Sequence, residues 1–151
     1  MSDNTYWPVD YENKYPVEPQ YLEFCEYGCM GDGNRLVWDP ISQTLEIRDY
    51  SGEAATKVLP VPTRSQWKAF WILLDRARVW DWETSYVDET GICDGGGWKL
   101  DASYAGRCIK SSGYNAYPDS RGMHYLPGSS FDVFSAAILM LTNGQFPGLS
   151  D

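Results

Sequence analysis

The chain has 151 residues, of which 43% are hydrophobic and 15% aromatic, which suffices for one domain with its own core and excludes global disorder. Its formal net charge of −9 argues against direct binding of nucleic acid, which requires a basic surface. The sequence shows neither the long apolar run of a transmembrane helix nor the basic and then apolar start of a signal peptide. We therefore expect a cytoplasmic protein that does not enter a membrane.

Residues 1–20 are rich in tyrosine, proline and acidic side chains. Proline fixes φ and removes a hydrogen-bond donor, so this segment suits neither a helix nor a central strand. We expect an extended arm that precedes a single domain over residues 21–151. The aromatic side chains of the arm pack either on the domain itself or on a partner.

The segment from Tyr21 to Tyr27 alternates between two sets of side chains, which predicts a strand. A turn over residues 28–34 follows, and further strands are expected over 35–38, 44–50 and 56–59. Short strands joined by tight turns are typical of an antiparallel meander.

The clearest helix is predicted over residues 63–78. Thr63 and Gln66 have the spacing of a capping box, in which two side chains satisfy free amides at the helix start. The apolar side chains recur at helical spacing and predict a stripe that faces the core: Trp67, Phe70, Trp71, Leu74 and Ala77.

The second half of the chain predicts a hairpin and a last helix. Residues 81–96 suggest an acidic loop; residues 98–104 and 107–111 suggest two strands joined at Ala105-Gly106; and residues 112–129 suggest a long loop. Ser130 is the expected cap of a helix over 131–143, whose core stripe is Phe131, Phe134, Ile138 and Leu141, closed by Gly144. The expected fold class is α+β, with an antiparallel sheet (an N-terminal meander plus the later hairpin) packed by two helices.

Several motifs in the last two thirds of the chain occur together. They are Trp80-Asp-Trp82, then Asp94-Gly-x-x-Trp98-x-Leu100, then Ser111-Ser-Gly-x-Asn-Ala-Tyr-Pro118. This combination resembles a widespread group of small uncharacterised bacterial proteins with a W-x-W … DG-x-x-W-x-L … SSG-x-NAYP signature. The resemblance implies an α+β domain and no particular activity. In that group the helix follows the Pro almost at once, whereas here residues 119–130 intervene.

The four cysteines are the first candidate metal ligands. Cys25 and Cys29 are spaced like half of a zinc site, but Cys93 and Cys108 do not form a second close pair. A zinc site or a disulfide is the alternative to four free thiols in a reducing cytoplasm. The acidic residues of 81–94 are an alternative calcium site, although they lack EF-hand spacing. We expect free thiols, a solvated acidic loop, no metal and no cofactor.

Catalytic motifs are lacking. His124 is the only histidine, and Cys108 or Ser112 would have to partner it in a nucleophilic relay, for which no spacing pattern is present. The protein is therefore expected not to be an enzyme.

The segment 112–118 allows two interpretations. In one, Ser112 and Asn115 hydrogen-bond a polar ligand on which tyrosines stack. In the other, Gly113 supplies a positive φ, Asn115 bonds backbone groups and Tyr117 packs under the sheet.

The acidic, aromatic-rich composition favours a non-catalytic protein-interaction module. Such a module could act as an inhibitor that occludes a basic, nucleic-acid-binding site on another protein, as phage counter-defence or toxin-immunity proteins do. Its expected contact residues are Asp81, Glu83, Asp88 and Glu89. The alternative is a module that binds a small molecule or nucleotide through the 112–125 loop, with Ser112, Asn115, Tyr117, Arg121 and His124 as ligand residues.

Overall fold

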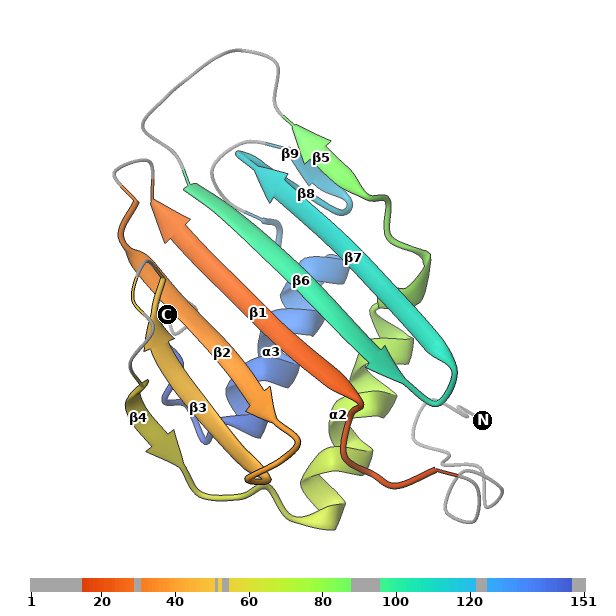
Figure 1. Ribbon diagram of the computed structural model, residues 1–151. Coiled ribbons are helices and arrows are strands. Elements are labelled where there is room, and N and C mark those ends of the chain that lie inside the picture. The colour runs from red at the N-terminus through yellow and green to blue at the C-terminus, as the bar shows by residue number, and fades with distance from the viewer. Residues whose placement is uncertain are drawn as a thin grey trace.

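The computed structural model of the chain describes residues 15–28, 31–50, 52, 55–87, 96–121 and 125–147. The elements are β1 (Tyr21–Gly28), β2 (Gly33–Asp39), β3 (Thr44–Asp49), β4 (Ala55–Leu59), α2 (Arg64–Arg76), the 3-10 turn η1 (Val79–Asp81), β5 (Ser85–Val87), β6 (Gly96–Tyr104), β7 (Arg107–Tyr114), β8 (Ala116–Tyr117), β9 (Ser120–Arg121) and α3 (Ser130–Leu141). They form two layers, in which one seven-stranded sheet packs against α2 and α3 (Figure 1). Neither of these helices is long and apolar enough to cross a membrane.

The strand order is β4-β3-β2-β1-β6-β7-β5, and every neighbouring pair is antiparallel except β5 and β7. The predicted α+β class, the meander and the later hairpin are confirmed. The hairpin turn has left-handed backbone at both Ala105 (φ +53°) and Gly106 (φ +80°), as a two-residue turn between twisted strands requires. The meander and the hairpin belong to one sheet, because the whole of β1 pairs with β6, from Tyr21 opposite Ser103 to Gly28 opposite Gly96.

Both helices lie on the same face of the sheet (Figure 1). The capping box of α2 forms as predicted, since the Thr63 hydroxyl accepts from the Gln66 amide and the Gln66 side chain accepts from the Thr63 amide. The cap of α3 is Ser129, one residue earlier than expected, because its extended backbone lets its hydroxyl accept from the Asp132 amide. The predicted stripes of both helices are fully buried against the sheet.

The two segments predicted as loops contain strands. Residues 85–87 form β5, which pairs in parallel with β7, and β7 continues to Tyr114 before the small β8–β9 ladder. Strand β5 is short and its partner lies far along the chain, so no local pattern indicated it. Its addition extends the sheet beyond the predicted hairpin.

The described end of the N-terminal arm packs on its own domain. Val17 is only 5% exposed, and its carbonyl accepts a hydrogen bond of 2.7 Å from the indole N–H of Trp71 in α2. Residues 1–14 of the arm lie outside the described residues.

Candidate functional site

The sheet has a second face, which none of the described helices covers (Figure 1). Alternation along β1 sends Leu22 and Phe24 into the core and Glu23 and Cys25 to this open face. Residues directly opposite each other in neighbouring strands point to the same side of a sheet, so the register decides what joins them. Four polar side chains lie opposite or next to Glu23 and Cys25 on this face: Arg35, Lys99, Asp101 and, one strand further, Lys110.

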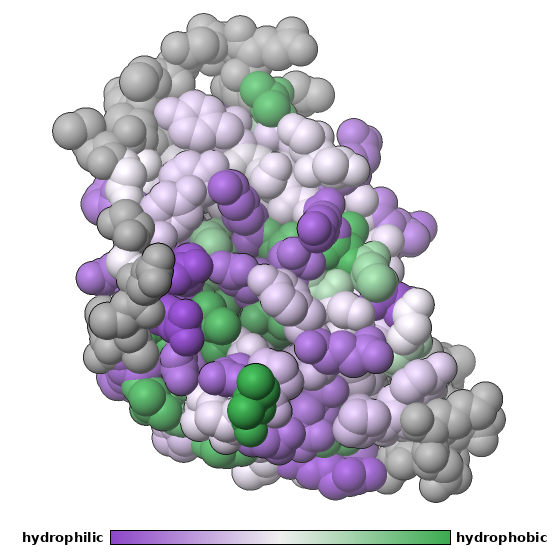
Figure 2. All heavy atoms as spheres, in the orientation of Figure 1, coloured by the Kyte–Doolittle hydropathy of each residue, from purple (hydrophilic) through white to green (hydrophobic). Residues whose placement is uncertain are grey.

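A hollow of about 560 Å³ lies on the open face; we call it the open-face hollow. In Figure 2, hydrophobic surface lies recessed between hydrophilic side chains in the middle of this face. The residues used below line it: Glu23, Cys25, Arg35, Tyr50, Lys99, Asp101, Lys110 and Ser112. Its volume falls in the range of roughly 300–1,000 Å³ that is usual for sites of small organic ligands.

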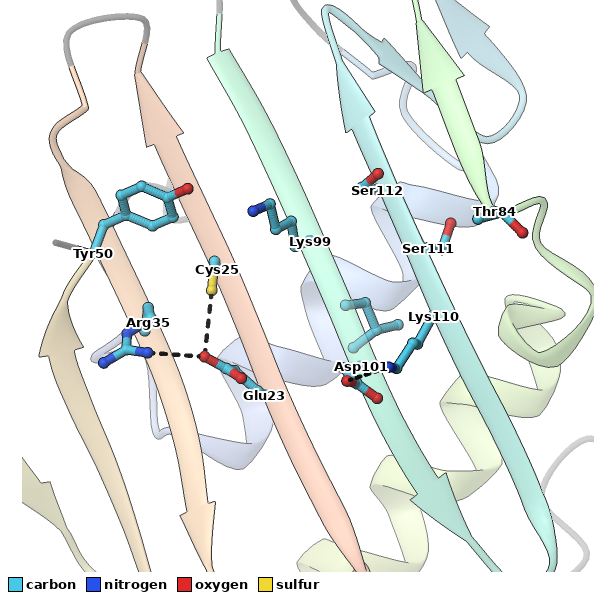
Figure 3. Close-up of a pocket in the computed structure, with 11 residues that line it drawn as sticks. Glu23, Cys25, Arg35, Tyr50, Thr84, Lys99, Asp101, Lys110, Ser111 and Ser112 are labelled. Carbon is cyan, nitrogen blue, oxygen red and sulfur yellow. Dashed lines mark hydrogen bonds and ion pairs between the residues drawn. The ribbon is translucent and has the colours of Figure 1, made fainter. Parts of the chain in front are cut away.

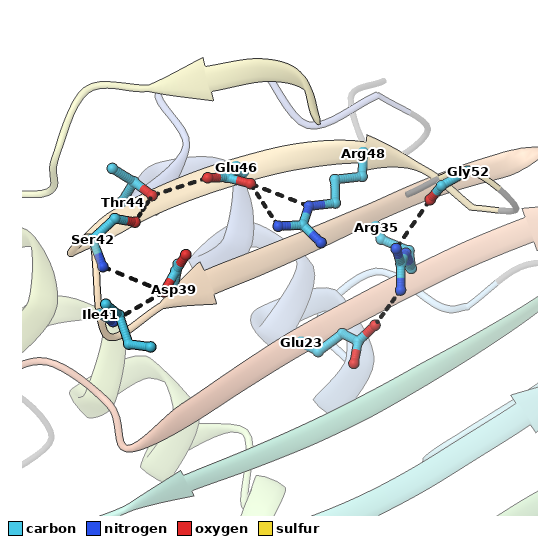
Figure 4. Close-up of polar contacts among 9 residues, drawn as sticks. All are labelled: Glu23, Arg35, Asp39, Ile41, Ser42, Thr44, Glu46, Arg48 and Gly52. Carbon is cyan, nitrogen blue, oxygen red and sulfur yellow. Dashed lines mark hydrogen bonds and ion pairs between the residues drawn. The ribbon is translucent and has the colours of Figure 1, made fainter. Parts of the chain in front are cut away.

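Among the described residues, two of the three cationic side chains that line the open-face hollow pair with carboxylates, and the third does not. The guanidinium of Arg35 lies 3.1 Å from the Glu23 carboxylate, and its other terminal nitrogen donates to the Gly52 carbonyl at 3.0 Å (Figure 4). The Lys110 ammonium lies 3.8 Å from the Asp101 carboxylate. Lys99, between these pairs, has no carboxylate partner among the described residues and extends from β6 toward β1 (Figure 3).

A second set of polar contacts continues the open face toward the edge of the sheet. On β3 the carboxylate of Glu46 accepts two hydrogen bonds from the Arg48 guanidinium, at 2.8 and 3.1 Å, and a third from the Thr44 hydroxyl (Figure 4). These charges neutralise each other. Lys99 therefore differs from the other described cations of the open-face hollow, because no described carboxylate neutralises it.

The aromatic side of the open-face hollow is formed by Tyr50, whose ring stacks on that of Tyr27 with centroids 4.6 Å apart. The Lys99 ammonium lies 6.0 Å from the centre of the Tyr27 ring, at the outer limit of a cation–π contact. The Tyr27 ring itself occupies the space over Gly97, where an added Cβ would meet it at 2.3 Å. A flat aromatic surface therefore stands beside Lys99, which has no carboxylate partner among the described residues.

Cys25 contributes a neutral thiol to the floor of the hollow. Burial, and secondly the nearby Glu23 carboxylate, raise the pKa of Cys25 to about 12. Nucleophilic cysteines need the opposite, a pKa lowered toward neutrality. Cys25 is therefore a small buried hydrophobic group at physiological pH.

The structure separates the residues that the sequence suggested as one ligand site. Ser112 lies on the open face and lines the hollow, whereas Asn115 is 2% exposed and its side-chain oxygen accepts from the Gly96 amide. Tyr117 packs on the helix side of the sheet, with its ring 4.7 Å from that of Phe131. The side chain of Arg121, at the end of β9, and the whole of His124 lie outside the described part of the chain.

The structural interpretation of the 112–118 segment holds in part. Asn115 (φ +54°) bonds backbone and Tyr117 packs beneath the sheet, as that interpretation stated. The expected positive φ of Gly113 is wrong. Gly113 is needed for space, since an added Cβ would lie 2.3 Å from both the Ala116 carbonyl oxygen and the Trp98 indole nitrogen.

Two of the four predicted acidic contact residues are described. Asp81, the last residue of η1, and Glu83, in the connection from η1 to β5, are both exposed. The backbone of Glu83 is held on both sides, because its amide donates to the Tyr86 hydroxyl and its carbonyl accepts from the Ser111 hydroxyl. Asp88 and Glu89 lie outside the described residues.

The described cysteines, Cys25 and Cys108, are free thiols, while Cys29 and Cys93 lie outside the described residues. Among the described residues, no three His, Cys, Asp or Glu side chains converge to hold a metal ion.

The sequence analysis missed the open-face hollow. The signal was present in the alternation of β1 and β6, whose polar positions include Glu23, Lys99 and Asp101. The apolar positions of the same strands predict the core. The two strands are far apart in sequence. Only the pairing of β1 with β6 shows that their polar positions share one surface.

Comparison of the chain with protein-family models, with curated proteins and with solved structures finds no match in any of the three.

Proposed function

We propose that the protein is a non-catalytic binding module that holds a small anionic ligand in the open-face hollow. The observation that carries this proposal is Lys99, a cation without a carboxylate partner among the described residues, placed between two neutralised ion pairs. An acidic protein that keeps such a cation in a concavity offers one local site for a phosphate or carboxylate group.

The neighbours of Lys99 supply the remaining contacts. The hydroxyl of Ser112, opposite Lys99 in the β6–β7 ladder, can donate to an anion, and the Tyr50 ring offers a flat apolar surface for an aromatic or aliphatic part. The raised pKa of Cys25 keeps its thiol protonated, which favours binding over nucleophilic chemistry in this hollow.

The test is an NMR titration of the ¹⁵N-labelled protein with inorganic phosphate, pyrophosphate and adenosine monophosphate. We expect amide shifts confined to the residues around the hollow, on β1, β2, β6 and β7 and at Tyr50. Lys99→Met should weaken binding roughly tenfold or more, because it removes a charge-assisted hydrogen bond. Lys57→Met is the matched control, since Lys57 is an exposed lysine on β4 outside the hollow. Equal weakening by both variants, or the absence of shifts with all three probes, contradicts the proposal.

A second candidate is the protein-interaction module, in which the acidic connection after η1 occludes a basic site on a partner protein. The exposure of Asp81 and Glu83 on a backbone held by hydrogen bonds favours it, because an ordered acidic segment loses little entropy on binding. The test is competition with duplex DNA for a basic DNA-binding protein. Replacing Asp81, Glu83, Asp88 and Glu89 with their amides should slow association and flatten its salt dependence. Salt-independent binding contradicts this candidate.

A further inference from the structure

A second, smaller cavity lies on the opposite side of the sheet from the open-face hollow. Its volume is about 100 Å³. It lies where the end of β1 and the start of β6 meet β8 and the first turn of α3. It is too small for a drug-sized molecule, for which roughly 300 Å³ is the lower end. The lining side chains that matter here are Phe24, Glu26, Trp98, Tyr117, Tyr125 and Phe131.

Aromatic rings dominate this cavity. The Phe131 ring lies 4.9 Å from the rings of Trp98 and Tyr125 and 4.7 Å from that of Tyr117. The rings of Tyr117 and Tyr125 meet edge to face, with centroids 5.3 Å apart. Trp98 and Phe131 are almost completely buried, whereas Tyr117 and Tyr125 keep part of their surface accessible, so the two tyrosines form the outer part of the cavity. We call Trp98, Tyr117, Tyr125 and Phe131 the aromatic cage.

One acidic side chain stands among these rings. Glu26 points to the helix side of β1, where the neighbouring position of the same face is the core residue Phe24. Its carboxylate accepts a hydrogen bond of 3.0 Å from the Asn34 side-chain amide, and no lysine or arginine among the described residues pairs with it. Burial raises the pKa of Glu26, so its negative charge is poorly compensated in the free protein.

We propose that the aromatic cage and Glu26 together bind an alkylated ammonium group, such as the trimethylammonium of a small metabolite or of a methylated lysine side chain. The faces of aromatic rings attract a cation electrostatically, most strongly where water is excluded, and a methylated ammonium loses less hydration than a primary one. The carboxylate supplies the compensating charge. This site differs from the anion site proposed above, because Glu26 lies on the helix side of β1, whereas Lys99 lines the hollow on the open face.

The structure also allows a purely structural role for Glu26, as the acceptor for Asn34. The two roles predict different behaviour for Glu26→Gln. Glutamine keeps an oxygen that accepts from Asn34, so the structural contact survives, but it has no charge for a cation. Binding and folding are thereby tested separately by one substitution.

The experiment is an NMR titration with choline and with its neutral isostere 3,3-dimethyl-1-butanol, in which a carbon replaces the nitrogen. The reporters are the Trp98 indole N–H, which donates to the Ala116 carbonyl at 3.0 Å, and the Phe131 amide. We expect choline to shift both signals and the isostere to bind at least tenfold more weakly. A peptide with one trimethyl-lysine, compared with choline, distinguishes a protein ligand from a small metabolite; tighter binding of either one supports the cage.

Four variants complete the test. Glu26→Gln and Tyr125→Leu should each reduce choline affinity at least tenfold. Glu46→Gln, a strand glutamate on the open face, should leave it unchanged. Equal binding of choline and its neutral isostere, unchanged affinity in Glu26→Gln, or no shift of either reporter overturns the proposal. Lys99→Met should not alter choline binding, so failure of the anion site and failure of the cage are distinguishable.

Discussion

Trp71 and Tyr104 stack face to face, with ring centroids 4.0 Å apart and ring planes within 5° of parallel. Both are 1% exposed, and the contact joins the middle of α2 to the end of β6. The indole N–H of the same Trp71 donates to the carbonyl of Val17, so one side chain connects the arm, a helix and the sheet. The stability of the fold should therefore be sensitive to this position.

Trp71→Ala should lower the free energy of unfolding by about 3–5 kcal/mol, because it leaves a large cavity and an unpaired carbonyl. Phe134→Ala in α3, at a position that is 0% exposed, should cost a similar amount. Urea unfolding followed by fluorescence measures both. Arg76→Ala, at an exposed position of α2, is the control and should stay within about 0.5 kcal/mol of wild type. A loss below 1 kcal/mol at Trp71 would contradict the packing described here.

Gly113→Ala should destabilise the protein by about 1–3 kcal/mol through overpacking. The added methyl would collide with the Ala116 carbonyl and the Trp98 indole nitrogen, and it would break the hydrogen bond between them. Gly52→Ala is a matched control, because its Cβ would meet no atom of the described residues closer than 3.4 Å. Thermal unfolding of the two variants measures the difference, and equal melting temperatures would show that Gly113 has room to spare.

Ala105→Asn should raise stability by about 1 kcal/mol. Ala105 has left-handed backbone (φ +53°), which costs an ordinary residue about 1–2 kcal/mol and which asparagine tolerates far better. Differential scanning calorimetry gives the change. The opposite substitution, Ala105→Val, should lower the melting temperature, and a hairpin indifferent to both would contradict the assigned turn.

Glu26→Gln should raise stability at pH 7 and not at pH 4. Burial, and to a lesser degree Asp32, raise the pKa of Glu26 above its ordinary value of 4.5, while hydrogen bonds from Asn34 oppose the shift. Between the unfolded and the folded pKa the native state binds more protons than the unfolded chain, so stability falls as pH rises through that window. Glutamine does not titrate, so the variant does not lose this stability as the pH rises. Melting temperatures of both proteins, without added amine, at pH 4 and pH 7 measure the effect; a variant less stable than wild type at pH 7 would show that the charged carboxylate stabilises the fold.

Cys25 should resist alkylation by iodoacetamide at pH 8, whereas the exposed Cys108 should react. The pKa of Cys25 is about 12, raised first by burial, so almost no thiolate is present at that pH. Peptide mass spectrometry after a timed reaction distinguishes the two thiols. Denaturation in urea should make both react at similar rates, and rapid labelling of Cys25 in the native protein would contradict its burial.

Local patterns determined the individual elements of this protein. The capping box at Thr63, the stripe from Trp67 to Leu74 and the turn at Ala105-Gly106 each depend on residues within a few positions of one another, so the sequence alone predicts them. The alternation of β1 likewise determines which side chains share a face. The aromatic character of Trp98 and Phe131 similarly indicated core positions.

Only the tertiary structure decided which strands are neighbours and which residues meet. The pairing of β1 with β6 brings Glu23 beside Asp101 and Cys25 beside Lys99, and the addition of β5 overturns a predicted loop. The start of α3 brings Phe131 to Trp98 and so completes the aromatic cage near Glu26. The physical reason is that periodicity depends on neighbours along the chain, whereas pairing between distant strands depends on the summed packing of the whole core, which no short segment encodes.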